Sequence, residues 1–178
     1  MSLSDYKALQ EVHLTEAEFR LLPREEQEHY LFLLDQEAKW KKSNKLSEYE
    51  PLPKPRRFHL ASAICRALVG GNRSGKTPAG GMEFLFHTTG QYPEWYPEDQ
   101  RYNGAIIGRI VVKDFQKGVG EVIVPFFEDW LDMSLVERKW KNPQGIPIKW
   151  KLKNGSVFDI LTHEQSTEQF EGWKGHIA

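Results

Sequence analysis

The segment Gly70-Gly71-Asn72-Arg73-Ser74-Gly75-Lys76-Thr77 follows the pattern G-x-x-x-x-G-K-T, which is the sequence signature of a phosphate-binding loop. Residues 63–69 precede it and are short, mostly apolar and compatible with a buried β-strand. Residues 82–87 follow it and can continue as a helix. A strand, a glycine loop and a helix in this order form the context in which the motif binds phosphate, so the sequence predicts such a loop here.

The residue types of this loop suit a nucleoside triphosphate with Mg²⁺. Successive backbone N–H groups can surround the phosphates, and the N-terminus of the next helix adds a partial positive charge. Gly70 and Gly75 permit backbone angles that a Cβ disfavours. We expect Lys76 to contact the β- and γ-phosphate oxygens and the hydroxyl of Thr77 to bind Mg²⁺. The predicted nucleotide-binding residues are Gly70, Gly71, Asn72, Arg73, Ser74, Gly75, Lys76 and Thr77.

Two further residues of this region are unusual, and the motif has an alternative interpretation. Arg73 could add positive charge beside the γ-phosphate in the transition state, or it could face solvent. Pro78 is compatible with the first turn of a helix, where its missing N–H has no intrahelical partner. The alternative to a phosphate site is an ordinary glycine turn with a solvated Lys76.

Composition sets broad limits on the class of protein. The 178 residues suffice for a domain with a real core, and the net charge of −1 provides no overall electrostatic reason to bind nucleic acid or membrane. Cys65 is the only cysteine, so an intramolecular disulfide is impossible, which fits a reducing compartment. We expect Cys65 to be a buried residue of the strand at 63–69. No apolar run approaches a membrane span, and the six histidines match no zinc spacing.

The chain is predicted to divide into a helical arm over residues 1–50 and an ATPase domain over residues 51–178. Thr15 and Glu18 have the spacing of a capping box, and Pro23 fits the start of a second helix. The three prolines of residues 50–57 predict an extended connector at the boundary.

The remaining segments predict strands, a helix and a hairpin. Residues 90–97 form an aromatic, proline-containing loop that we expect to pack over the sheet edge, and residues 103–112 read as a second strand. Asp114 can cap the next helix, which Pro125 should end or kink. Two alternating runs flank Asn154-Gly155, the strongest hairpin signal in the chain.

An acidic partner for the loop is not evident in the sequence. A P-loop NTPase holds Mg²⁺ with an aspartate at the end of an apolar strand. Asp114 follows a strand but has Lys113 before it, and Asp159 lies inside a strand. Residues 176–178 read as the start of a strand whose acidic end is absent. We therefore expect a truncated ATPase domain that hydrolyses ATP poorly by itself.

These features resemble the N-terminal ATPase domain of the large terminase subunit of tailed bacteriophages, the motor that packages DNA. The resemblance extends from about Thr15 to the last residue. It rests on Phe58-His59, the loop from Gly70 to Thr77, Gly90-x-Tyr92-Pro93-x-Trp95-Tyr96, Gly155-Ser156-x-x-x-Asp159 and Glu168-Gln169-Phe170-Glu171-Gly172.

The resemblance implies an α/β fold: a partial P-loop NTPase three-layer α/β/α sheet with helices on both faces, a β-hairpin and an N-terminal helical arm. It implies ATP and Mg²⁺ as cofactors, and a catalytic role for Lys76 and for Arg73, since the family's loop commonly carries an arginine. The acidic Walker B pair and the nuclease domain would lie beyond Ala178. The family's adenine-recognising glutamine is replaced near Pro55, and Pro78 replaces a residue that is usually a good helix former.

The implied partners are double-stranded viral DNA, the small terminase subunit, the portal and further copies of the protein in a ring. The implied location is the host bacterial cytoplasm and transiently the procapsid portal, with no membrane. The sequence leaves two alternatives open: another P-loop NTPase, such as a kinase or helicase-like protein, and a non-hydrolysing nucleotide-binding or assembly module.

Overall fold

A computed structural model describes residues 14–165, 168, 171 and 173–177. The chain forms two compact units, Met1–Asn44 and Lys45–Ala178, and each is described by itself. Their functional assignment as arm and ATPase domain stays a prediction. Within the described residues, no helix combines the length and the apolar character that crossing a membrane requires.

The first unit is helical, as the sequence predicts. Helix α2 (Glu16–Leu21) begins with the expected capping box: the Thr15 N–H donates to Glu18 Oε2 at 2.8 Å, and the Glu18 N–H donates to Thr15 Oγ1 at 3.4 Å. Helix α3 (Arg24–Ser43) begins directly after Pro23. This start agrees with the predicted helix, because proline restricts φ to helical values but needs no N–H partner there.

The predicted extended connector at residues 50–57 is wrong, because the second unit begins its regular structure with helix α4 (Pro53–His59). Pro53 and Pro55 lie in its first turn, where backbone N–H groups have no intrahelical acceptor, so neither proline costs a hydrogen bond. The Arg56 N–H makes the first one, to the Leu52 carbonyl at 2.9 Å.

The strand predicted at residues 63–69 is also wrong. The segment between α4 and helix α5 (Lys76–Thr89) has no regular secondary structure, and Ile64 and Val69 are almost completely exposed. Cys65, expected in a buried strand, is an exposed free thiol. The physical reason is pairing: a strand requires a neighbour for its backbone groups, and none of the described strands pairs with these residues.

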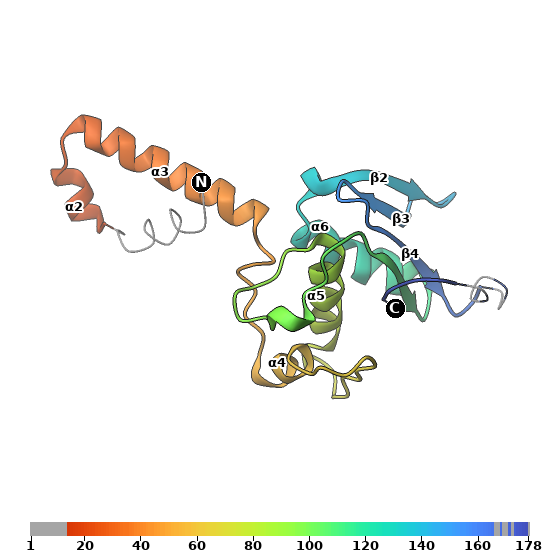
Figure 1. The fold of residues 1–178 in the computed structure, drawn as a ribbon. Coiled ribbons are helices and arrows are strands. Elements are labelled where there is room, and N and C mark those ends of the chain that lie inside the picture. The colour runs from red at the N-terminus through yellow and green to blue at the C-terminus, as the bar shows by residue number, and fades with distance from the viewer. Residues whose placement is uncertain (1–13, 166–167, 169–170, 172, 178) are drawn as a thin grey trace. The chain divides into compact units, whose positions relative to one another are not determined.

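The second unit also contains a mixed four-stranded sheet (Figure 1). Its order is β1 (Ile107–Val112), β4 (Val157–Thr162), β3 (Pro147–Leu152), β2 (Val136–Lys141). Strands β1 and β4 are parallel, whereas β4–β3 and β3–β2 are antiparallel. The hairpin at Asn154-Gly155 is confirmed, with Gly155 at φ 90°. Strand β1 is shorter than predicted, and β2 was not predicted because its sequence is dominated by charged residues.

Helical turns connect β1 to β2. The Asp114 side chain accepts hydrogen bonds from the N–H groups of Lys117 and Gly118, at 2.8 and 3.2 Å, and so caps the π-helical segment η2 (Phe115–Ile123), as predicted. The chain continues as α6 (Val124–Trp130), with Pro125 in its first turn. The change from π- to α-helix at this point agrees with the interruption expected at Pro125. Short 3₁₀ turns occur at η1 (Glu98–Gln100) and η3 (Met133–Leu135).

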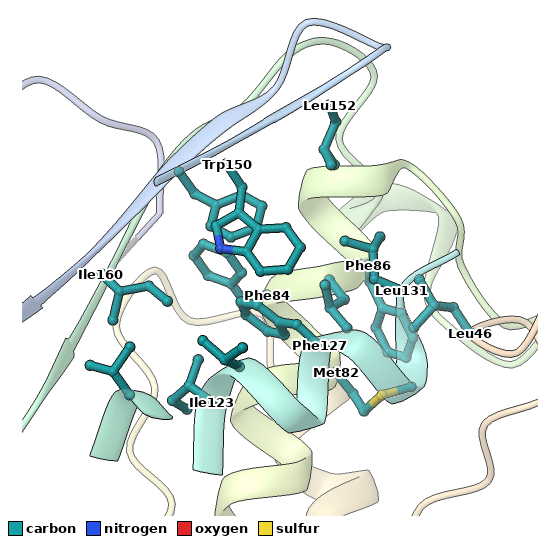
Figure 2. Packing of buried hydrophobic residues seen from close by; sticks show 14 of the residues in the cluster. Leu46, Met82, Phe84, Phe86, Ile123, Phe127, Leu131, Trp150, Leu152 and Ile160 are labelled. Atoms are coloured by element: carbon teal, nitrogen blue, oxygen red, sulfur yellow. The ribbon is translucent and has the colours of Figure 1, made fainter. Parts of the chain in front are cut away.

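Aromatic side chains join α5 and α6 to the sheet (Figure 2). Phe84 of α5 meets Phe158 edge-on with ring centroids 5.3 Å apart, and Phe127 of α6 lies 5.4 Å from the same ring. Trp150 stacks on Phe158 at 5.8 Å. These rings are buried and contribute apolar area as well as geometric preference. The core therefore fixes α5, and the α/β fold class predicted from the sequence is confirmed.

The aromatic loop at residues 90–97 packs against α5 and α4, not over the sheet edge as expected. Tyr96 is buried with its ring 5.6 Å from Phe86 of α5. Trp95 lies 5.6 Å from the His59 ring of α4, and its Nε1–H donates to the Tyr49 carbonyl at 2.9 Å. This loop therefore holds α4 against α5.

Candidate functional site

The glycine loop ends directly at the N-terminus of α5. Gly75 is the N-cap in the left-handed conformation, with φ 80°, and Lys76 is the first helical residue. The Lys76 ammonium donates to the carbonyls of Gly70 at 2.8 Å and Gly71 at 2.6 Å. The loop thus curls around its own lysine, with the helix N-terminus beside it. The ammonium group and the N–H groups at the helix N-terminus supply positive charge of the kind that an anion site requires.

The two glycines that define the motif have identifiable steric roles. A Cβ added to Gly70 would lie 2.7 Å from Ser74 Oγ, which is too close for that serine to remain in place. Gly75 needs its positive φ, which side chains with a Cβ rarely adopt. Arg73 also has a positive φ, 60°, an uncommon conformation for a residue other than glycine. The loop backbone is therefore held in a turn that only a restricted set of residues permits.

A cavity of about 380 Å³ opens beside Lys76 and Thr77. Its lining also includes Phe58 and Arg66 from before the glycine loop and Glu83 from within α5. The cavity therefore combines an ammonium group, the guanidinium groups of Arg66 and Arg109, a carboxylate, a hydroxyl group and apolar surface. The exposed Asn72 and Arg73 do not line it, and neither do Gly70, Gly71 or Ser74.

Neither acidic candidate of the sequence lies free at this cavity. The Asp114 carboxylate is occupied as a helix cap, and its hydrogen bonds with Lys117 and Gly118 lower its pKa. The Asp159 carboxylate pairs with the Arg109 guanidinium at 2.8 and 2.9 Å. Over the described residues, no group of His, Cys, Asp and Glu side chains has an arrangement that could hold a metal ion.

The predicted final strand begins as expected. Ile177 forms a parallel bridge with Gly108, and the Arg109 N–H donates to the Ile177 carbonyl at 2.9 Å. Ile177 therefore lies along the edge of β1 that faces away from β4. Among the residues that support the family resemblance, Gln169, Phe170 and Gly172 lie outside the described residues, as does Ala178.

Sequence reasoning missed a buried polar cluster centred on Glu83. His59 Nδ1 lies 2.6 Å from Glu83 Oε2, and the Tyr96 hydroxyl donates to Oε1 at 2.7 Å. His87 Nε2 lies 3.1 Å from Oε1, and the Arg66 guanidinium donates to the same oxygen. These four partners come from α4, the irregular segment, α5 and the aromatic loop. Only the His87 contact, four residues along α5, was accessible from sequence spacing.

The electrostatics of this cluster favour an ionised Glu83. Burial alone raises the pKa of a carboxyl group, but hydrogen bonds from His59, His87 and Tyr96, together with the charge of Arg66, lower the Glu83 pKa below its ordinary value. Burial and the neighbouring carboxylate conversely raise the pKa of the Tyr96 hydroxyl. The cluster is therefore a carboxylate with several donors in the low-dielectric interior, an arrangement that is costly to break.

The donor set at the loop fits Mg²⁺ only in part. Thr77 supplies a hydroxyl oxygen on the cavity wall, and Mg²⁺ in nucleotide sites commonly takes its other ligands from phosphates, water and one or two carboxylates. Thr77 can therefore be one ligand of a nucleotide-bound ion.

Comparisons with known proteins find partial similarity to phage terminases. No protein-family model matches the chain. Over 92 residues the chain is 37% identical to the terminase large subunit of Salmonella phage P22, a match that covers 49% of this chain and 18% of that relative. The chain thus matches less than a fifth of the relative's length. The Thermus phage P74-26 large terminase ATPase domain is a similar solved structure with a TM-score of 0.39 and 18% identity, covering 72% of this chain and 52% of that one.

The resemblance predicted from the residues is therefore confirmed by an independent comparison: about half of this chain is similar to part of the large terminase subunit of a tailed bacteriophage.

Proposed function

We propose that this chain is the nucleotide-binding part of a viral DNA-packaging motor, in which ATP hydrolysis drives DNA into a procapsid. The observation that carries the proposal is the position of the glycine loop: the G-x-x-x-x-G-K-T segment ends at the N-terminus of α5, with the Lys76 ammonium inside the loop. The similarity to a terminase large subunit supports the motor assignment.

The loop would bind ATP through its backbone and through Lys76. The ammonium group now donates to the Gly70 and Gly71 carbonyls. Phosphate oxygens are stronger acceptors because they are charged, so an entering triphosphate would compete for these donors. The hydroxyl of Thr77 would contribute one ligand to Mg²⁺, which neutralises charge on the phosphates when bound. Arg73, an exposed residue of the loop, would approach the γ-phosphate and stabilise transition-state charge.

A local excess of positive charge supports double-stranded DNA as a partner. Residues 136–153, the β2–β3 hairpin, hold six basic residues and one acidic residue, although the whole chain has a net charge of −1. The Arg138 guanidinium and the Lys149 ammonium both lie over the Trp140 ring, 4.6 and 5.5 Å from its centroid. Exposed cations of this kind suit a phosphate backbone. The further partners of the proposal are the small terminase subunit, the portal and additional copies in a ring, at the procapsid portal in the host cytoplasm.

Calorimetric titration with ATP and Mg²⁺ tests the proposed function. Wild-type chain should bind the nucleotide, and Lys76→Ala should bind it at least about tenfold more weakly, since hydrogen bonds between charged groups contribute about 1.5–3 kcal/mol. Lys174→Ala is the matched control, because it removes an exposed lysine outside the loop. Equal affinity of wild type and Lys76→Ala would refute the phosphate-site assignment.

A further inference from the structure

The segment that leads into the glycine loop lacks the support of a sheet. Residues 61–75 have no regular secondary structure, and both Ile64 and Val69 are almost completely exposed. Ordinary backbone pairing therefore does not fix the first half of the loop. A loop that must be ordered when a ligand binds loses affinity, because ordering each residue has an entropic cost. Some other contact must hold this segment close to its bound position.

Arg66 makes the contacts that do so. Its side chain is mostly buried, in contrast to the neighbouring Ile64. One guanidinium nitrogen donates to the carbonyls of Phe58 and His59, at 3.2 and 3.4 Å, at the C-terminal end of α4. The other donates to Glu83 Oε1, and the guanidinium also lies 5.2 Å from the centroid of the Phe58 ring. One side chain therefore connects the irregular segment to two helices.

The acceptor, Glu83, is itself rigidly held. His59, His87 and Tyr96 donate to its two oxygens in addition to Arg66. It belongs to α5, the helix whose N-terminus closes the glycine loop and whose Phe84 packs into the main core. The Arg66–Glu83 pair thus joins the chain before the loop to the helix after it. Both side chains also line the cavity that contains Lys76 and Thr77.

We propose that the Arg66–Glu83 ion pair is a clamp that positions the glycine loop for nucleotide binding, with Arg66 and Glu83 acting as positioning residues. This inference rests on the proposed function for its ligand. In the clamp, the planar guanidinium group spans the carboxylate and the α4 carbonyls at once, with a fixed fork of donors that a lysine ammonium lacks. The clamp replaces the sheet pairing that the segment lacks, so the loop is ordered before the phosphates arrive.

The test combines nucleotide affinity with NMR order parameters of the backbone N–H groups in the full chain. In Arg66→Met, the N–H order parameters of residues 66–75 should fall from about 0.85 to below about 0.6, while those of β3 and α6 stay unchanged. The affinity for ATP with Mg²⁺ should fall about tenfold, and Arg66→Lys should lie between wild type and Arg66→Met. Arg57→Met is the matched control, because Arg57 is an exposed arginine of α4, and it should change neither readout.

A double variant separates the clamp from simple charge balance. If Arg66 served only to neutralise Glu83 beside the phosphates, then Arg66→Met combined with Glu83→Gln would restore the wild-type affinity. The clamp predicts that affinity stays low, because the connection is still absent. Restored affinity, or unchanged order parameters at residues 66–75 in Arg66→Met, would overturn the inference. The order-parameter measurement needs no nucleotide, so failure of the clamp is distinguishable from the failure of the proposed function, which Lys76→Ala reports.

Discussion

Gly80 and Gly81 are adjacent residues in the interior of α5, but their surroundings differ. A Cβ built on Gly80 meets no atom within 4 Å. A Cβ built on Gly81 would lie 2.4 Å from Cε1 and 2.9 Å from Cζ of Phe126, a residue of α6. Replacing each glycine by alanine therefore makes the same chemical change in open space and in a packed helix–helix contact.

The two substitutions share one stabilising component. Alanine is better than glycine inside a helix by about 0.8–1.0 kcal/mol, so Gly80→Ala should stabilise the protein by about that amount. Gly81→Ala gains the same increment, but the Phe126 ring must move by about 1 Å to reach ordinary carbon–carbon contact. Its neighbours Phe127 and Trp130, 6.0 and 6.3 Å away between ring centroids, resist that shift. Overpacking of this kind costs about 1–3 kcal/mol.

The difference between the two variants isolates the packing cost, because the helix-propensity gain cancels. Urea unfolding followed by circular dichroism should place Gly80→Ala above wild type, and Gly81→Ala about 1–3 kcal/mol below Gly80→Ala. In thermal scans the same gap corresponds to about 2–4 °C per kcal/mol for a chain of this size. Equal stability of the two alanine variants would refute the close packing of α5 on α6 at Gly81.

Three other predictions concern the Glu83 cluster, the proposed nucleotide site and the β2–β3 hairpin. Glu83→Gln should reduce the acid sensitivity of unfolding. The folded protein lowers the pKa of Glu83, so the ionised carboxylate stabilises the fold fully above pH 4.5, the ordinary pKa of a glutamate. This stabilisation is lost as the pH falls below 4.5 toward the lowered pKa. Urea titrations at several pH values measure this, and parallel curves for wild type and variant would contradict it. Arg73→Ala, placed in a chain with ATPase activity, should lower kcat far more than it weakens nucleotide binding, and unchanged turnover would return Arg73 to a solvent-facing role. Arg138→Gln combined with Lys149→Gln should weaken binding to duplex DNA and lower the slope of log affinity against log salt by about 2. Removing two positive charges from α3 instead should leave that slope unchanged. An equal change of slope in the α3 variant would show that DNA binding is not specific to the β2–β3 hairpin.

Local chemistry explains why several features were predictable from the sequence alone. The capping box at Thr15 needs only two residues three positions apart, and the turn at Asn154-Gly155 needs only the positive φ that Gly155 adopts. The start of α5 likewise follows from Gly75, whose left-handed conformation suits a helix boundary. The caps and turns involve atoms that lie within a few residues of one another along the chain. The local amino-acid sequence is therefore sufficient to specify them.

Tertiary structure decided the features that depend on distant partners. The apolar residues 63–69 have the composition of a strand, but a strand forms only where another strand accepts its hydrogen bonds, and here no described strand does. The helix at Pro53–His59 is stabilised by His59, which inserts among aromatic rings and contacts Glu83 from another helix. The Glu83 cluster itself joins residues as far apart as His59 and Tyr96. No single partner offsets the cost of removing the Glu83 charge from water. Burial of this carboxylate therefore requires the folded chain, which brings several donors to it.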